Sequence, residues 1–172
     1  MSQWKKKAVI EVRKVRGPTC IVLPVFFSAD GKTLASMATG EILLSNAATG
    51  AELVRIKDVG RGTFALAPDG KSLASAGKGS IRLWGAAPGT ELFRLESPAE
   101  QTLCLSFSPD GRRLASLGED HIVRIWDVAQ RRQWATFELP RRKGVSLVFS
   151  GDGSRLAVGM EGSVLIWPVP AR

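Results

Sequence analysis

Histidine and cysteine are almost absent from this sequence of 172 residues. His121 is the single histidine, and Cys20 and Cys104 are two widely spaced cysteines. Acid–base catalysis and metal binding need clusters of such side chains, and no nucleophile motif is present either. We therefore expect no enzyme activity, no catalytic residue, no metal site and no cofactor. The two cysteines fit no redox or disulfide pattern, so we expect reduced thiols in a cytoplasmic protein.

Long apolar runs are also missing. No stretch approaches the roughly 18 apolar residues of a transmembrane helix, so no membrane insertion is expected. The N-terminus has a basic start at residues 5–7, but Glu11 and Arg13 interrupt the apolar stretch that follows. A signal peptide needs an uninterrupted apolar core, so this sequence favours a cytoplasmic location.

One short turn recurs four times along the chain. Its fullest form is Phe107-Ser108-Pro109-Asp110-Gly111, and the other copies lie at residues 27–31, 66–70 and 149–153. The turn glycines follow one another at steps of 39, 41 and 42 residues. Asp-Gly between two apolar runs favours a tight hairpin, because Asp bonds its own backbone and Gly adopts positive φ. A fixed period of about 40 residues predicts a repeat architecture.

A second pattern runs in phase with the turns. Trp84, Trp126 and Trp167 each end a short apolar strand, 15 or 16 residues after the turn aspartate. Turn and tryptophan together resemble the WD-repeat β-propeller family over nearly the whole chain. The resemblance implies an all-β fold, a propeller of four four-stranded antiparallel blades in a single unit over residues 1–172. The expected blades span about 24–57, 63–96, 102–139 and 145–168.

The fourth repeat is one strand short. Residues 8–13, ahead of the first repeat, alternate partly like the outer strands, and in this family an N-terminal strand commonly completes the last blade. Three outcomes stay open: a closed four-bladed ring, a homodimer that forms an eight-bladed ring, or part of a longer propeller. An open half-ring would expose apolar faces and strand edges. We favour the two-chain ring, since the repeats resemble those of larger propellers.

The sequence departs from the family pattern in its polar network. The name-giving Trp-Asp pair survives only at Trp126-Asp127, and the family's turn aspartate matches Asp120 alone. The Gly-His pair that normally bonds this aspartate is absent. The usual Asp–His–Ser/Thr–Trp network therefore cannot form in any blade, and hydrophobic packing between blades must contribute more stability. His121 and the turn aspartates are expected as turn residues rather than catalytic groups.

The charge is strongly basic, with a formal net charge of +8. On the expected loops, one face carries six basic and seven acidic residues, and the opposite face eleven basic and seven acidic. The resemblance implies a non-catalytic scaffold for protein–protein interaction. The alternative is binding of nucleic acid or another anionic surface through the basic face. The candidate partner-binding residues are Arg112, Arg113, Arg131 and Arg132 on the basic face and Arg141, Arg142 and Lys143 on the other.

Overall fold

The computed structural model describes residues 25–38, 40–57, 59, 62–140 and 144–170. Across these ranges the chain forms fifteen strands in four antiparallel sheets and no helix. The described residues thus contain no helix long and apolar enough to cross a membrane. The fold is all-β, as the sequence predicts.

Each sheet follows the chain without crossovers. The first sheet contains β1 (Val25–Phe27), β2 (Thr33–Ala38), β3 (Glu41–Asn46) and β4 (Glu52–Ile56). The second contains β5 (Phe64–Leu66), β6 (Ser72–Ala76), β7 (Ser80–Gly85) and β8 (Glu91–Glu96). The third contains β9 (Thr102–Phe107), β10 (Arg113–Gly118), β11 (Ile122–Asp127) and β12 (Arg132–Glu138). The fourth has three strands, β13 (Gly144–Phe149), β14 (Arg155–Met160) and β15 (Ser163–Pro168).

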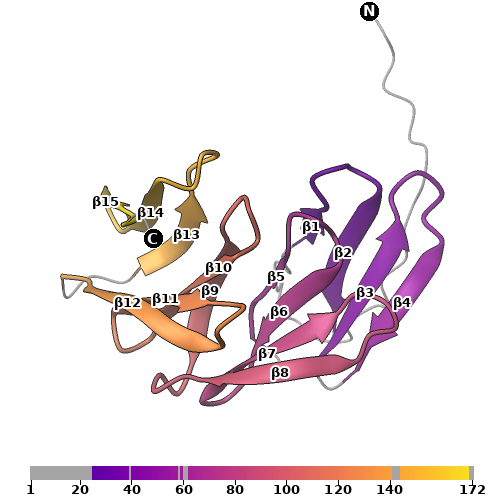
Figure 1. Cartoon of the computed structure of the whole chain (residues 1–172), viewed down its shortest axis with the longest axis horizontal. Helices are drawn as coiled ribbons and strands as arrows, with labels where there is room; N and C mark the ends of the chain where they lie inside the picture. The colour runs from indigo at the N-terminus through magenta and orange to yellow at the C-terminus, as the bar shows by residue number, and fades with distance from the viewer. Residues whose placement is uncertain (1–24, 39, 58, 60–61, 141–143, 171–172) are drawn as a thin grey trace, which may run out of the picture.

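The sheets lie side by side along an arc, with the first and fourth sheets at its two ends (Figure 1). The inner strands β1, β5, β9 and β13 follow one another along the arc. This is a propeller-like arrangement of repeated sheets. The four sheets span residues 25–56, 64–96, 102–138 and 144–168. The N-terminal strand expected at residues 8–13 lies outside the described residues.

The recurring turn has the predicted chemistry. The glycines Gly31, Gly70, Gly111 and Gly153 have φ between 67° and 71°, the left-handed region that an L side chain rarely adopts. Each turn aspartate accepts a hydrogen bond of 2.9–3.0 Å from the amide two residues on. In three of the turns a serine hydroxyl donates to the same carboxylate. The aspartates are therefore turn residues, as predicted.

The hydrophobic core is divided into three clusters, one between each pair of neighbouring sheets. Each cluster joins two kinds of surface. The aliphatic face of a sheet is the side that carries the pairs Ile42/Leu44, Ile81/Leu83, Val123/Ile125 and Val164/Ile166. The Trp face is the opposite side, at the position of Trp84, Trp126 and Trp167, which is Ser45 in the first sheet. In every cluster the aliphatic face of one sheet packs on the Trp face of the next.

Part of the usual polar network survives inside these interfaces. The indole nitrogens of Trp84 and Trp126 donate hydrogen bonds of 2.8 Å to the hydroxyls of Ser75 and Ser116. All four side chains are buried. Trp84 and Trp126 thus pack between neighbouring sheets, while Trp167 is half-buried and stacks on Phe137.

Candidate functional site

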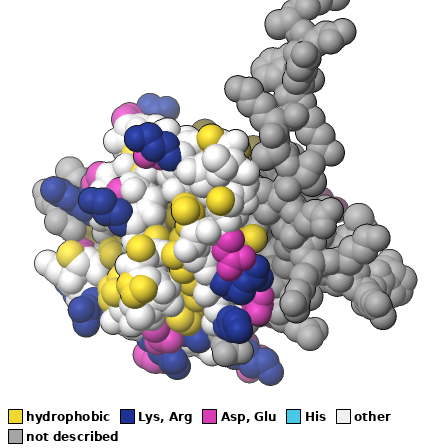
Figure 2. Space-filling model, turned by 90° about the vertical axis from the view of Figure 1, so that its right-hand side faces the viewer, with side chains coloured by type: hydrophobic (Ala, Val, Ile, Leu, Met, Phe, Trp, Pro, Cys, Tyr) yellow, Lys and Arg dark blue, Asp and Glu magenta, His cyan; other side chains and the backbone are white. Residues whose placement is uncertain are grey.

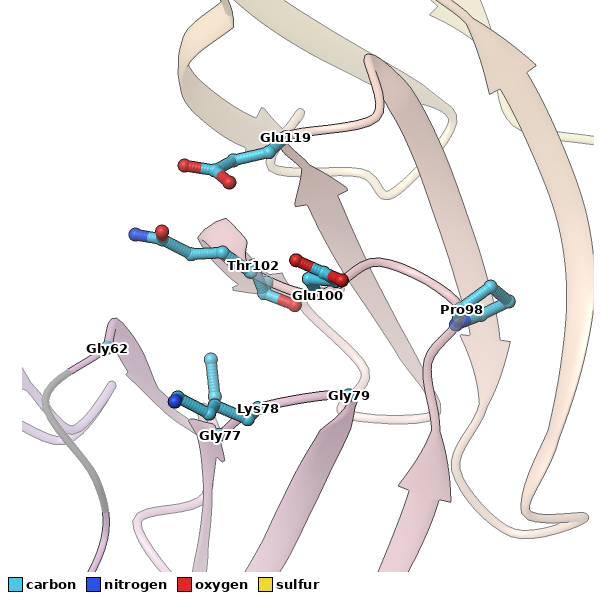
Figure 3. A pocket seen from close by; sticks show the side chains of 10 residues that line it. Gly62, Gly77, Lys78, Gly79, Pro98, Glu100, Thr102 and Glu119 are labelled. Atoms are coloured by element: carbon cyan, nitrogen blue, oxygen red, sulfur yellow. The ribbon is translucent and has the colours of Figure 1, made fainter.

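A pocket of about 750 Å³ opens between the second and third sheets. Its lining comes from the β6–β7 turn, the β8–β9 loop, the β10–β11 turn and the residue before β5. It therefore lies at one end of the sheets. This end is formed by the b-to-c turns, which join the second and third strands of a sheet, and by the d-to-a loops, which join one sheet to the next. Figure 3 shows Lys78 and Glu119 on opposite sides of the pocket, with Glu100 and Thr102 between them.

Backbone hydrogen bonds hold the loops of the two sheets together. The amide of Gly79 donates to the carbonyl of Glu100 at 3.3 Å, and the amide of Ser97 donates to the carbonyl of Gly79 at 2.9 Å. The amide of Glu119 donates to the carbonyl of Gln101 at 3.0 Å. These bonds connect the turn of the second sheet to the loop that leads into the third. The pocket walls are thus fixed relative to each other.

Two glycines keep the walls close. A Cβ on Gly62 would lie 2.7 Å from the carbonyl oxygen of Ala76, and one on Gly118 would lie 2.6 Å from the Cβ of Ala99. Real Cβ atoms do not approach backbone oxygens or other Cβ atoms this closely, so these positions require glycine. Gly62 lies just before the inner strand β5, and Gly118 ends β10.

The turn that carries Glu119 is fixed by an ion pair. Arg124 is 5% exposed and donates to both carboxylate oxygens of Asp120, at 3.2 and 2.6 Å. Burial opposes ionisation of Asp120, but the hydrogen bonds from Arg124 and the amide of Ile122 outweigh it and hold the pKa of Asp120 below its usual value. Arg124 takes the role that the missing histidine has elsewhere in the family. This partner was not predicted from the sequence.

His121 occupies a turn position where the other repeats have glycine. Its φ is 61°, close to the 66° of Gly79 and the 78° of Gly162. Its amide donates to the carbonyl of Gly118 at 3.2 Å, and its side chain is exposed. The expectation that His121 is a solvated turn residue is confirmed.

The chemistry of the pocket is that of a recognition site. Its charged side chains are Lys78, Glu100 and Glu119, all exposed, with the amide of Gln101 and the buried hydroxyl of Thr102 beside them. The part of the chain that the structure describes has no group of three histidine, cysteine, aspartate or glutamate side chains able to hold a metal. A mixture of opposite charges, amide and small residues suits a peptide segment.

The four arginines predicted on the basic face come together at the opposite end of the third sheet. Arg112 immediately precedes β10, which begins at Arg113, and Arg131 immediately precedes β12, which begins at Arg132. Arg113 and Arg132 both pair with Asp127 in register. The guanidinium of Arg113 lies 4.2 Å from the centroid of the Trp134 ring, and that of Arg131 lies 4.6 Å from Phe93. Arg132 donates to the amide oxygen of Gln130 at 2.7 Å.

The second predicted cluster, Arg141, Arg142 and Lys143, lies outside the described residues. Of the two cysteines, Cys104 is described: it is a free thiol on β9, and its Sγ lies 3.4 Å from the carbonyl oxygen of Val145. Burial raises the pKa of this thiol, which keeps it protonated and unreactive at neutral pH.

The repeats match a known family at the centre of the chain. Residues 62–85 and 89–127 match the model of the family described as WD domain, G-beta repeat. These two segments are WD repeats, which confirms the resemblance that the sequence indicates. A comparison with curated proteins gives no match. The two matched segments are the strands β5–β7 and β8–β11, which supply all the walls of the pocket. WD repeats are in general scaffolds for protein interaction, so this part of the chain is an interaction module.

The pocket residues were not nominated as a site from the sequence. They belong to short turns and loops of two different repeats, 78 and 119 in b-to-c turns and 98–102 in a d-to-a loop. A signal existed: in a propeller these turns of neighbouring repeats gather on one face. Only the structure shows which pair of repeats encloses a pocket.

Proposed function

We propose that the chain is a non-catalytic scaffold that binds a peptide segment of a protein partner in the pocket between the second and third sheets. The observation that carries this proposal is the pocket itself, about 750 Å³ in volume and formed by both matched WD-repeat segments. Its size lies within the roughly 300–1,000 Å³ range of typical ligand sites. Rigid walls reduce the entropy lost on binding, which favours an extended segment over a flat contact.

The side chains that line the pocket indicate which residues the bound peptide segment should contain. Glu100 and Glu119 suit a lysine or arginine side chain, while Lys78 suits a carboxylate placed on the other side. Gln101 and Thr102 offer amide and hydroxyl groups to a peptide backbone. A segment with both signs of charge, rather than a uniformly acidic or basic one, is expected to bind.

A peptide library displayed on phage tests the proposal. Peptides selected on the wild-type protein should bind it, and should lose most of their affinity for the variants Glu119→Lys and Lys78→Glu. Measurement by fluorescence polarisation at constant salt gives the dissociation constants. Truncation of a central contact typically weakens binding by about 2 kcal/mol or more, roughly thirty-fold.

The matched control is Glu161→Lys. Glu161 is an exposed acid in the same turn of the fourth sheet and does not line the pocket. Peptides that bind the Glu161→Lys and Glu119→Lys variants equally would contradict a role for the pocket. Failure of the library to give any binding peptide would leave the scaffold proposal without its site and count against it.

The four arginines at the other end of the third sheet favour a second candidate function, binding of nucleic acid or another anionic surface. Two of them lie over aromatic rings, which orients their guanidinium groups at the surface. Affinity for a short DNA duplex should then fall steeply as salt rises. Replacement of Arg112, Arg113, Arg131 and Arg132 by glutamine should abolish the binding. Unchanged binding by that variant would end this candidate.

We also propose the architecture in which this scaffold acts. The four sheets are blades of a propeller, residues 8–13 add the outer strand that the fourth sheet lacks beside β15, and two chains form an eight-bladed ring in the cytoplasm. Support comes from the unpaired outer edge of β15 among the described strands, since an exposed edge promotes pairing with another strand. Deletion of residues 1–13 should therefore lower the melting temperature. An unchanged melting temperature would contradict the strand addition.

A further inference from the structure

The packing between sheets follows one rule three times. The aliphatic pairs of the first three sheets are at most 2% exposed, because each is covered by the Trp face of the following sheet. On the Trp faces, the inner-strand residues of the second, third and fourth sheets are at most 8% exposed: Phe64, Leu66, Leu105, Phe107, Leu147 and Phe149. Within the arc, each sheet thus packs its Trp face on the preceding sheet and its aliphatic face on the following sheet.

At the C-terminal end of the arc, no sheet among the described residues covers the aliphatic face of the fourth sheet. Val164 is 63% exposed and Ile166 is 60% exposed, although the same positions are buried in the other three sheets. Val148 on β13 is 58% exposed. Val148, Ala157 and Ile166 lie opposite one another across β13, β14 and β15, in the same register as Ala65, Ala74 and Leu83 of the second sheet. The face is built like the others but has no partner.

At the N-terminal end of the arc the inner part of a Trp face is open. Val25 is 57% exposed and Phe27 is 64% exposed, whereas the equivalent Phe64 and Leu66 are buried. Farther out on the same side, Leu43 and Ser45 are already buried. The open part is therefore the inner strand β1. Figure 2 views this end of the molecule and shows hydrophobic side chains grouped among charged ones.

The Asp-Gly turns show the same two free ends. A Cβ on Gly70 would lie 3.1 Å from the Cβ of Ser28, and one on Gly153 would lie 3.5 Å from Pro109, so each of these turns contacts the turn of the preceding sheet. A Cβ on Gly31 or on Gly151 would meet nothing within 4 Å. Gly31 is equivalent to Gly70, which contacts the turn of the preceding sheet, and Gly151 is equivalent to Pro109, which contacts the turn of the following sheet. Within the described part of the chain, the row of turns therefore has no further neighbour at either end.

We infer that the free aliphatic face of β13–β15 docks on the open Trp face at β1 of a second copy of this chain. The contact continues an interface that the chain already makes three times, with an aliphatic pair on one side and the inner-strand residues Val25 and Phe27 on the other; Ser45 stands at the tryptophan position of this last face. The two faces belong to the two sheets that end the arc (Figure 1). Burial of these exposed apolar side chains favours the contact.

The contact is head-to-tail. Two copies that each use both ends close into a ring with two-fold symmetry, while copies whose rotation does not close form longer chains. This inference rests on the propeller architecture proposed above and gives it a specific interface. It does not depend on the peptide pocket, which lies between the second and third sheets and away from both ends.

Light scattering coupled to size-exclusion chromatography, over a range of concentrations, tests the inference. The wild-type chain should have a mass near twice 18.5 kDa, or a multiple that grows with concentration. The single variants Ile166→Lys and Phe27→Lys should each shift to 18.5 kDa, because a buried lysine opposes docking. Leu92→Lys is the control, since Leu92 is 52% exposed on β8 and lies on neither end. A wild-type chain of 18.5 kDa at every concentration would overturn the inference.

Mixing the two variants distinguishes a head-to-tail contact from a symmetric one. Ile166→Lys keeps an intact β1 face, and Phe27→Lys keeps an intact β13–β15 face, so the mixture should associate through one good interface. If the contact joined two identical faces, only the variant with the lysine in that face would lose its dimer. Mixing the two variants would then restore no association of that variant. Circular dichroism melts of each variant exclude unfolding as the cause of a lower mass.

An engineered disulfide shows whether the turn at Gly31 contacts the turn at Ser150 of a second copy or of the same chain. Ser150→Cys with Gly31→Cys, in a background with Cys20 and Cys104 replaced by serine, should give a cross-linked dimer on a non-reducing gel. Ser28→Cys with Gly70→Cys is the matched control, because it places the same pair at the turn contact within one chain, where the Cβ separation is 3.1 Å. A cross-link within one chain for the 31/150 pair would show a closed four-sheet ring and overturn the inference. Peptide binding to the pocket is measured separately on the same variants, so failure of one proposal is distinguishable from failure of the other.

Discussion

The indole nitrogen of Trp126 donates a hydrogen bond of 2.8 Å to the hydroxyl of Ser116, and both side chains are buried between the second and third sheets. Trp84 and Ser75 repeat this pair one sheet earlier. The first sheet has Ser45 at the tryptophan position, and the fourth has Val158 at the serine position, so neither can form it. Among the described residues, this Trp–Ser hydrogen bond is therefore found in the second and third sheets, where it joins neighbouring strands of the same sheet.

Removing the hydroxyl should leave the indole N–H buried without a partner. Ser116→Ala is expected to lower the free energy of unfolding by about 1–3 kcal/mol, the typical cost of an unsatisfied buried group. Ser163→Ala is the control, since Ser163 is exposed. Urea denaturation followed by tryptophan fluorescence gives both values. Equal effects of the two variants would show that the Trp126 hydrogen bond contributes nothing.

The buried guanidinium of Arg124 should destabilise the folded protein when the carboxylate of Asp120 is removed. Asp120→Asn removes the charge while keeping the size of the side chain, and leaves an arginine that is 5% exposed without its carboxylate. We expect a loss of about 1–3 kcal/mol, a typical value for hydrogen bonds to charged groups. Replacing Arg124 by methionine in the same variant should recover part of the loss, because the buried charge is then removed. No recovery in the double variant would contradict this explanation.

The turn aspartates should make stability depend on acid pH. Hydrogen bonds from Ser150 and from the amide and hydroxyl of Ser154 lower the pKa of Asp152 to about 2, against 3.8 for an ordinary aspartate. Because the folded pKa is lower than the unfolded one, this contribution is present above pH 4 and is lost as the pH falls toward 2. Asp152→Asn should therefore flatten the fall of stability between about pH 4 and pH 2. A slope identical to that of the wild type would show that Asp152 is not coupled to folding.

Position 118 should require glycine because neighbouring atoms leave no space for a Cβ, and not because the backbone has a positive φ there. A Cβ there would collide with Asp120 and with Ala99, so Gly118→Ala is expected to cost about 1–3 kcal/mol, typical of overpacking. Gly151→Ala is the matched control, because a Cβ at 151 meets nothing within 4 Å. Thermal melts compare the two. A loss that is no larger at 118 than at 151 would show that the wall of the pocket can shift.

His121 should be less favourable than the glycine found at its position in the other repeats. A left-handed backbone conformation costs an L residue roughly 1–2 kcal/mol, part of which the greater freedom of glycine in the unfolded chain offsets. His121→Gly is therefore expected to stabilise the protein by up to about 1 kcal/mol without changing peptide binding. A destabilising effect would indicate a contact of the imidazole that outweighs the backbone strain.

The sequence predicts most of the fold because the repeat leaves local signals. Asp-Gly turns require a positive φ, and alternating apolar residues fix which side of each strand is buried, so strand positions follow from residue types such as Gly70, Gly111 and Trp84. The three-stranded fourth sheet was also predicted from the length of the last repeat. Arg124 as the partner of Asp120 was not predicted, because an arginine inside a strand normally indicates an exposed position.

The candidate site depends on relations between repeats, which local patterns do not contain. Gln101 and Lys78 line the same pocket only because neighbouring sheets pack face to face. The arginine cluster at residues 112–113 and 131–132 was easier to find, since both pairs lie in hairpin turns at one end of the same sheet. Its aromatic contacts, Arg113 with Trp134 and Arg131 with Phe93, appear only in the structure.

Backbone hydrogen exchange, measured with and without a peptide selected on the wild-type protein, tests the central proposal most directly. Binding in the pocket should slow exchange at residues 77–79, 98–102 and 118–121, the turns and loop that form its walls. Exchange in the Asp-Gly turns at the other end of the sheets should not change. Protection confined to those turns or to the arginines of the third sheet, with none around the pocket, would contradict the account.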